Sequence, residues 1–252
     1  MVNGSMVHGL IFAAGLGTRL KPLTDRMPKA LVPLAGKPLL QWQVEKLRDA
    51  GITDIIVNVH HFPDMIIDTI RANQGWNCNI TVSDERDMLL DTGGGLKKVK
   101  GERLKVKGEP ILACNVDILS NIDLRALISA YERTGVSQLV VSKRETQRYL
   151  CFDERDRLCG WTNIKTGEVR PNNGTWKIED AQLLAFSGMQ ILSPDVLAML
   201  DTMKEDKFSL IDFYLSICGK AELKAFVPND YRMMDVGKID QIEEAETFAE
   251  SL

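Results

Sequence analysis

From Val7 to Val141, short apolar runs alternate with amphipathic stretches, and this alternation constrains the fold more than any other feature of the chain. Each run is rich in Ile, Val and Leu and is followed by a polar loop and a segment with apolar residues at helical spacing. Such a rhythm is typical of an α/β fold with a doubly wound, mainly parallel, Rossmann-like sheet that is covered on both faces. The expected strands are 8–13, 54–59, 79–83, 110–115 and 138–142, and the expected helices are 39–50, 63–73, 95–100 and 123–134.

The pattern changes after Lys143, where short strand-like pieces are separated by turn-forming sequences. We therefore predict one domain over 7–252, with a small antiparallel lobe inserted at about 145–180. The strand-like pieces are 149–152, 157–162, 168–169 and 175–178; they are followed by a strand at 183–191, helices from 194 and over 210–218, a strand at 222–227 and a helix at 243–252.

The composition excludes several classes of protein. A chain of 252 residues with 44% hydrophobic and 26% charged residues suits a globular fold, and a net charge of -4 with scattered Lys and Arg argues against nucleic acid as a partner. The apolar run from Leu10 to Ala14 is far too short to span a membrane. The five cysteines are widely spaced and never form a Cys-x-x-Cys pair, so they predict a reducing, cytoplasmic location without a zinc site.

A glycine-containing loop follows the first expected strand, at the edge of the sheet where doubly wound folds bind ligands. Gly15 and Gly17 allow the backbone to approach a phosphate chain closely and to offer its N–H groups. A dinucleotide-binding loop is the competing interpretation, but Leu20 occupies the place of its third glycine, and no Walker-type Gly-Lys-Ser/Thr follows. A tight turn without a ligand is the other alternative.

Two cations follow this loop, and two aspartates end later segments. Arg19 and Lys29 lie among glycines and prolines, where they can neutralise charge on a departing pyrophosphate, or merely solvate a loop. Asp117 follows an apolar strand, and Asp235 precedes the last helix. Because Mg²⁺ bound to a polyphosphate takes only one or two protein carboxylates, both are candidate metal ligands. Taken singly, each can also be a helix N-cap or a turn aspartate, and without the rest of the pattern this alternative is the favoured one for Asp235.

The run Gly15-Leu16-Gly17-Thr18-Arg19-Leu20, continued by Pro28-Lys29-Ala30-Leu31-Val32-Pro33, resembles the opening of the nucleoside-diphosphate-sugar pyrophosphorylases, or sugar-1-phosphate nucleotidyltransferases. The resemblance implies that an NTP and a sugar 1-phosphate are converted to an NDP-sugar and pyrophosphate, with Mg²⁺ held by Asp117 and Asp235. Lys238 stands where the family usually has threonine after its Asp-Val-Gly. Arg19 and Lys29 would be catalytic, and Ala13, Ala14, Gly15, Gly17 and Thr18 would bind the nucleotide.

The triple glycine after Asp91 is the second nucleotide-side candidate. Glycines at the start of a helix permit close contact with a flat base, whereas the alternative is a flexible turn capped by Thr92. By the same resemblance this segment borders the base, so Thr92, Gly93 and Gly94 are assigned to the nucleotide. The triple glycine is also similar to that of N-acetylmuramate 1-phosphate uridylyltransferases.

The sugar side has weaker signals. Ser187 and Gly188 resemble the strand of the family that faces the sugar, although Gly188 can also be a bulge in a buried strand. Asn115, at the end of an expected strand, is assigned to the sugar by the same resemblance. Family members often carry Glu-Lys-Pro with its lysine on the sugar phosphate; this chain lacks that motif, and Lys165, one position later, is the candidate replacement.

Two substrate pairs are favoured by the resemblance, namely UTP with N-acetylmuramate 1-phosphate, and GTP with mannose or heptose 1-phosphate. A CTP-dependent phosphocholine cytidylyltransferase, a catalytically silent nucleotide-binding module and a nicotinamide oxidoreductase are the alternatives. The expected partners are the NTP and the sugar 1-phosphate, with no nucleic acid and no membrane, and the chain is expected to be a monomer or a small homo-oligomer.

Overall fold

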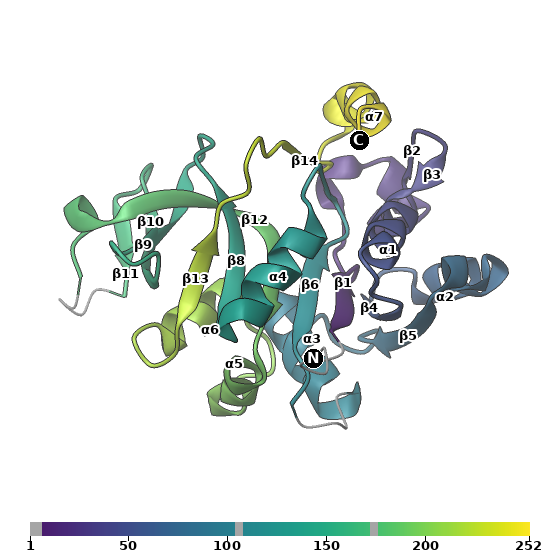
Figure 1. Ribbon diagram of the computed structural model, residues 1–252. Coiled ribbons are helices and arrows are strands. Elements are labelled where there is room, and N and C mark those ends of the chain that lie inside the picture. The colour runs from purple at the N-terminus through teal and green to yellow at the C-terminus, as the bar shows by residue number, and fades with distance from the viewer. Residues whose placement is uncertain (1–6, 104–107, 172–175) are drawn as a thin grey trace.

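A large mixed sheet forms the centre of the protein (Figure 1). The structure is a computed structural model that describes residues 7–103, 108–171 and 176–252. Four parallel strands form one half of the sheet, which confirms the predicted doubly wound α/β class. Their spatial order is β6 (Ile111–Asn115), β1 (His8–Phe12), β4 (Asp54–Val59) and β5 (Asn79–Asp84).

The other half of the sheet is built around β12 (Gln182–Leu192), which pairs antiparallel with β6. This long strand also pairs with β8 and with β9, so it joins the parallel half to the antiparallel lobe, drawn at the left of Figure 1. The other strands of this half are β8 (Ser137–Ser142), β13 (Leu223–Phe226), β9 (Arg148–Phe152), β10 (Leu158–Asn163) and β11 (Glu168–Arg170).

One predicted piece of the lobe is wrong in its described part. Within the expected strand 175–178, Thr175 lies outside the described residues, and Ile178 begins a 3-10 turn, Ile178–Asp180. Ile178 is exposed and is followed by two acidic residues, so pairing this segment in a sheet would bury little apolar surface.

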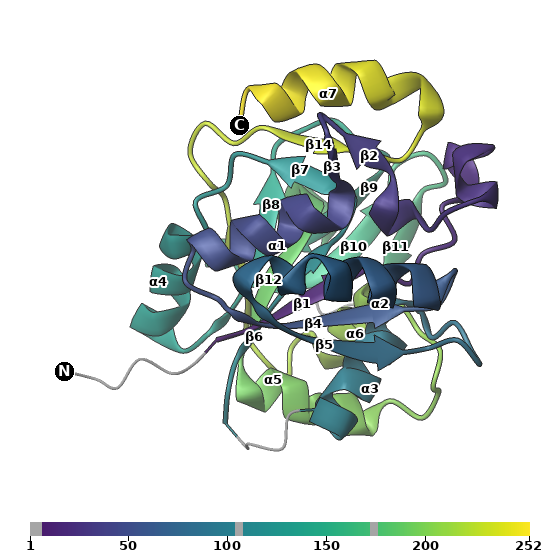
Figure 2. The same ribbon diagram turned by 90° about the vertical axis from the view of Figure 1, so that its right-hand side faces the viewer.

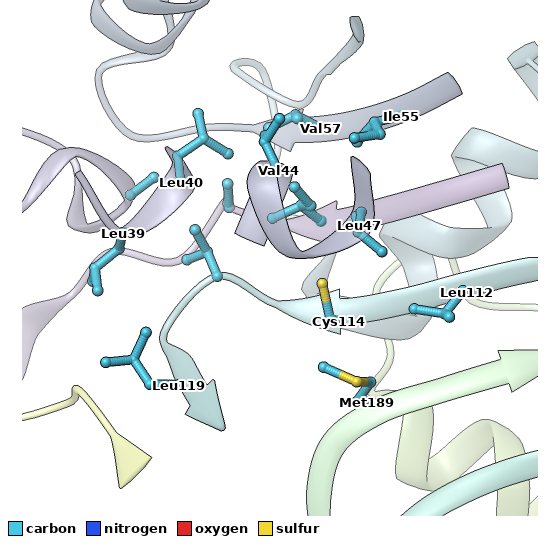
Figure 3. Packing of buried hydrophobic residues seen from close by; sticks show 14 of the residues in the cluster. Leu39, Leu40, Val44, Leu47, Ile55, Val57, Leu112, Cys114, Leu119 and Met189 are labelled. Carbon is cyan, nitrogen blue, oxygen red and sulfur yellow. The ribbon is translucent and has the colours of Figure 1, made fainter. Parts of the chain in front are cut away.

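Helices cover both faces of the sheet, as Figure 2 shows. Side chains alternate along β1, so Ile11 packs into one core, whereas Leu10 and Phe12 pack into the other. Figure 3 shows part of the first core, where Val44 of α1 lies near Val57 of β4. This face carries α1 (Leu39–Asp49), α2 (Pro63–Ala72) and α4 (Leu124–Thr134), and the opposite face carries α3 (Asp91–Arg103), α5 (Pro194–Ala198) and α6 (Leu210–Ile217). The last helix, α7 (Ile242–Glu250), packs against the short strand β2 (Pro33–Leu34) at the end of the first core.

Two small strand pairs were not expected, because segments of two or three residues carry no periodic signal. In the first, β2 (Pro33–Leu34) pairs with β3 (Lys37–Pro38). In the second, β7 (Ile118–Ser120) pairs antiparallel with β14 (Met233–Asp235), which brings the C-terminal region back to the end of β6. Over the described ranges, no helix combines the length and apolar character that crossing a bilayer requires.

Lys46 of α1 contacts β7 and should make the free energy of unfolding depend on pH. Its ammonium donates to the carbonyl and the hydroxyl of Ser120, and burial lowers the pKa of Lys46 to about 8. Below pH 8, Lys46 is charged in both the folded and the unfolded protein, and its burial as a charged group destabilises the folded state. Between pH 8 and pH 10.5 it is neutral in the folded protein but still charged in the unfolded one, so the free energy of unfolding rises with pH. In urea unfolding at pH 7 and pH 10, the free energy of unfolding of the wild type should rise by about 2 kcal/mol relative to Lys46→Met. A constant difference between the two proteins would contradict this expectation.

Candidate functional site

A cleft of about 520 Å³ opens at the carboxyl ends of β1, β4 and β6. The glycine loop that follows β1 forms one wall, and residues near the start of α3 form the other. This is the edge where doubly wound folds bind their ligands. Its lining includes Ala13, Ala14, Gly15, Gly17, Thr18, Arg19, Lys29, Asn58, Leu89, Asp91, Thr92, Asn115, Asp117, Lys207 and Gly237.

The glycine loop is anchored at both ends by buried polar groups. The N–H of Ala13 donates to Oδ1 of Asn58 at 2.7 Å, and Asn58 in turn donates to Glu85. Gly17 has a φ of +63°, and the Thr24 hydroxyl donates to its carbonyl at 2.9 Å. A Cβ on Gly17 would lie 2.8 Å from Thr24 and 3.0 Å from Lys29. The loop therefore needs glycine at this position both for its conformation and for its close approach to Lys29.

The two candidate metal-binding aspartates lie on adjacent segments. Asp117 follows β6, Asp235 ends β14, and the N–H of Val236 donates to the Asp117 carbonyl at 2.9 Å. Burial and then repulsion by Asp117 raise the pKa of Asp235, while Lys29, Arg19 and Arg144 oppose the rise. Since α7 starts at Ile242, Asp235 is not its N-cap, and the capping alternative is wrong.

Each aspartate has a cationic partner from the first loop region. Lys29, which is only 8% exposed, forms an ion pair with Asp117. Nη2 of Arg19 lies 3.7 Å from Oδ2 of Asp235, and both of these side chains are about half-exposed. The structure thus brings together two cations suited to phosphate and two carboxylates suited to a hard metal ion.

The oxygen donors of this pair fit a magnesium ion that shares its coordination with a substrate. Mg²⁺ usually takes one or two carboxylates and completes its shell with phosphate and water. No cluster of three acidic, histidine or cysteine side chains able to hold a metal occurs in the described part of the chain. Asp117 and Asp235 are the residues that would hold the ion.

Gly237 keeps Arg19 close to Asp235, because a Cβ there would lie 2.6 Å from Nη2 of Arg19 and 2.7 Å from Oδ1 of Asp235. Both clashing groups are side-chain ends that can move, so Gly237→Ala should change the free energy of unfolding by less than about 0.5 kcal/mol. Their displacement should lower kcat about tenfold or more. Gly101→Ala is the matched control, since its Cβ meets nothing within 4 Å. Equal kcat for both variants would show that the Arg19 position is unimportant.

A second hollow of about 290 Å³ adjoins the cleft and shares Asn115 with it. Gly188 has a φ of +67°, and a Cβ on it would lie 2.7 Å from Nδ2 of Asn115. The pairing register of β12 with β8 shifts here, so the bulge interpretation of Gly188 is confirmed, and the bulge forms part of a hollow. The hollow is lined by Asn115, Ile118, Arg144, Phe186, Ser187, Gly188, Met233 and Asp235.

The structure separates the members of the triple-glycine segment. Thr92 lines the cleft, and its hydroxyl accepts from the N–H of Leu210 at 3.1 Å. The N–H groups of Gly93 and Gly94 donate to the Phe208 carbonyl at 2.9 and 3.1 Å. The expected start of α3 at Gly95 is wrong, because the helix begins at Asp91. Its glycines Gly93 and Gly94 pack against the segment 206–208. Gly93 and Gly94 thus lie behind the cleft wall.

Lys165 lies in the turn between β10 and β11, where its N–H donates to Asn163, and it lines neither hollow. Several lining residues were missed by sequence reasoning. Asn58 had a usable signal, because it is a polar residue inside an apolar strand. Arg144, Lys207 and Leu89 had none, since they lie in irregular segments that the tertiary fold brings to the site.

Comparisons with known proteins agree with this geometry. A family model described as Nucleotidyl transferase matches residues 8–251. An N-acetylmuramate alpha-1-phosphate uridylyltransferase of Caulobacter vibrioides is 33% identical over 232 residues, which cover 87% of each chain. A mannose-1-phosphate guanyltransferase of Debaryomyces hansenii is 29% identical over 236 residues, which cover 92% of this chain and 61% of that protein. The crystal structure of HddC from Yersinia pseudotuberculosis, complexed with GMP-PN, shares the fold with a TM-score of 0.72 at 24% identity, over 96% of this chain and 99% of its own. The chain therefore belongs to the nucleotidyl transferase family and is an enzyme of the sugar-1-phosphate nucleotidyltransferase class.

Proposed function

We propose that the cleft binds a nucleoside triphosphate, that the adjoining hollow binds a sugar 1-phosphate, and that the two react between Asp117 and Asp235. The observation that carries this proposal is the contact between the two hollows, which share Asn115, with Asp117 in the lining of the cleft and Asp235 in the lining of the second hollow. A phosphate oxygen of the sugar forms a bond to the α-phosphorus, and the bond from that phosphorus to the α,β-bridging oxygen breaks. Pyrophosphate leaves, and the product is an NDP-sugar.

The residues of the site have separate roles in this reaction. Arg19, Lys29 and the amides of the glycine loop neutralise the charge that develops on the departing pyrophosphate. Asp117 and Asp235 would hold Mg²⁺, which supplies positive charge to the reacting phosphates when it is bound. Binding both substrates side by side makes the transfer effectively unimolecular. No side chain has to form a covalent intermediate.

UTP with N-acetylmuramate 1-phosphate is the substrate pair that we favour. The Caulobacter vibrioides relative named for this reaction matches 87% of both chains, whereas the match to the mannose-1-phosphate guanyltransferase covers 61% of that protein at lower identity. GTP with mannose 1-phosphate is the second candidate. We further propose that 7–252 acts as one nucleotidyltransferase domain. The five free cysteines suit the cytoplasm.

Pyrophosphate release tests the proposal. The protein is mixed with Mg²⁺ and each of four NTPs, crossed with the 1-phosphates of N-acetylmuramate, mannose, glucose and heptose. A strong preference for UTP with N-acetylmuramate 1-phosphate supports the favoured pair, and a preference for GTP with mannose 1-phosphate replaces it. The absence of release with every pair would contradict the proposed reaction.

A further inference from the structure

The second hollow contains one cationic side chain among its eight lining residues, namely Arg144. Arg144 lies two residues beyond the end of β8. Since β8 and β6 both run antiparallel to β12, the two strands point the same way and end at the same edge of the sheet. The fold therefore brings Arg144 to the edge that carries Asn115 and the glycine loop, although no sequence motif marks it.

The guanidinium of Arg144 is oriented by one hydrogen bond and has further N–H donors for a ligand. Nη2 donates to the carbonyl of Phe186 at 2.8 Å, which orients this exposed side chain toward β12. This is its single hydrogen bond among the contacts of the described residues, and a guanidinium carries five N–H donors in a planar fork. Arg144 is therefore held by one donor while the others are open to a ligand.

A buried hydroxyl lines the same hollow. Ser187 is 1% exposed, and its side chain lies beside the hydroxyl of Tyr231. A hydroxyl has one donor and two acceptor positions, so this contact leaves Ser187 able to bind a ligand oxygen as well. The hollow thus combines the guanidinium of Arg144 with a buried hydroxyl beside Asp235.

From this arrangement we infer that Arg144 binds the phosphate of the sugar 1-phosphate. The sequence had suggested Lys165 for this role. The inference rests on the proposed function, in which the acceptor phosphate has to lie beside Asp235 to react. An Arg fork matches the oxygens of a phosphate monoester in a bidentate manner. A carboxylate on the sugar is the other anion that an arginine side chain binds well. We assign Arg144 to the phosphate because the reacting phosphate has to lie beside Asp235, which lines the same small hollow.

Calorimetric binding tests the assignment without depending on turnover. N-acetylmuramate 1-phosphate and glucose 1-phosphate, of which only the first carries a carboxylate, are titrated into the wild type, Arg144→Gln, Arg144→Lys and Lys165→Gln. Loss of a charge-assisted, bidentate contact should weaken the binding of both ligands to Arg144→Gln about ten- to a hundredfold. Arg144→Lys should retain part of the affinity, because it keeps the charge but loses the fork. Lys165→Gln should match the wild type.

Kinetics add an independent readout. In Arg144→Gln the KM for the preferred sugar 1-phosphate should rise by a similar factor, whereas the KM for the NTP should stay within about twofold. A loss confined to N-acetylmuramate 1-phosphate would reassign Arg144 to the carboxylate and overturn the inference. Loss in Lys165→Gln with normal binding in Arg144→Gln would overturn it too. If Arg144→Gln loses phosphate binding but the wild type never releases pyrophosphate, the inference on binding stands and the proposed reaction fails.

Discussion

Asp117→Asn is expected to lower kcat by about 10²–10³-fold while the protein stays folded. Asparagine has the same shape but no charge, so it cannot hold a hard cation with a carboxylate's strength. The backbone contact from Val236 to the carbonyl of residue 117 is retained, so β7 and β14 remain in place. Pyrophosphate release under saturating substrates gives kcat, and thermal unfolding reports the folded fraction.

The ion pair with Lys29 complicates this variant, because Lys29 is buried and loses its partner. The free energy of unfolding should fall by about 3 kcal/mol, as it does when one member of a buried pair is removed. Asp25→Asn, which breaks the exposed pair with Lys21, is the control and should change neither kcat nor stability measurably. Wild-type kcat in Asp117→Asn would remove this residue from the metal site.

Lys29→Met should lower kcat by about 10²-fold or more and weaken NTP binding, because the cleft loses its most buried cation. The substitution also leaves Asp117 without its ion-pair partner. Steady-state kinetics and NTP titration separate the effect on kcat from the effect on binding. Lys37→Met is the matched control, since Lys37 pairs with Glu45 outside the cleft.

The double variant Asp117→Asn/Lys29→Met distinguishes a shared role from two separate ones. Because the two side chains form one ion pair, their effects on kcat should not multiply, and the double variant should be only slightly slower than the slower single variant. Fully multiplicative losses would mean that Lys29 and Asp117 act independently in catalysis.

Much of the nucleotide side was predictable, because its residues are close together in the chain. Gly15, Gly17 and Arg19 follow one strong strand, and Asp117 follows another, so the edge of a parallel sheet places them without further information. Asp235 was found through a motif, but its strand β14 has three residues and pairs with another of three, which no periodicity reveals. Its approach to Asp117 required the tertiary structure.

The acceptor side was less predictable, because its residues come from segments with no regular pattern. Arg144 follows a strand by two residues and reaches the hollow only because β12 reverses the direction of the sheet. Lys165 had the more suggestive position in the chain, yet it lies in a turn of the lobe outside both hollows. Gly93 and Gly94 were expected to face a base, but the segment 206–208, distant in the chain, occupies the space beside them.

The place of β12 in the sheet also affects the order in which the sheet can form during synthesis on the ribosome. β6 is flanked by β1 on one side and by β12 on the other, and β12 is synthesised long after β6. During that interval the nascent chain has an apolar strand with an open edge, a state that invites pairing with other chains. Asp235 emerges later still, on β14. The phosphate loop can therefore form early in synthesis, whereas the second carboxylate of the site is added only after β12 has been made.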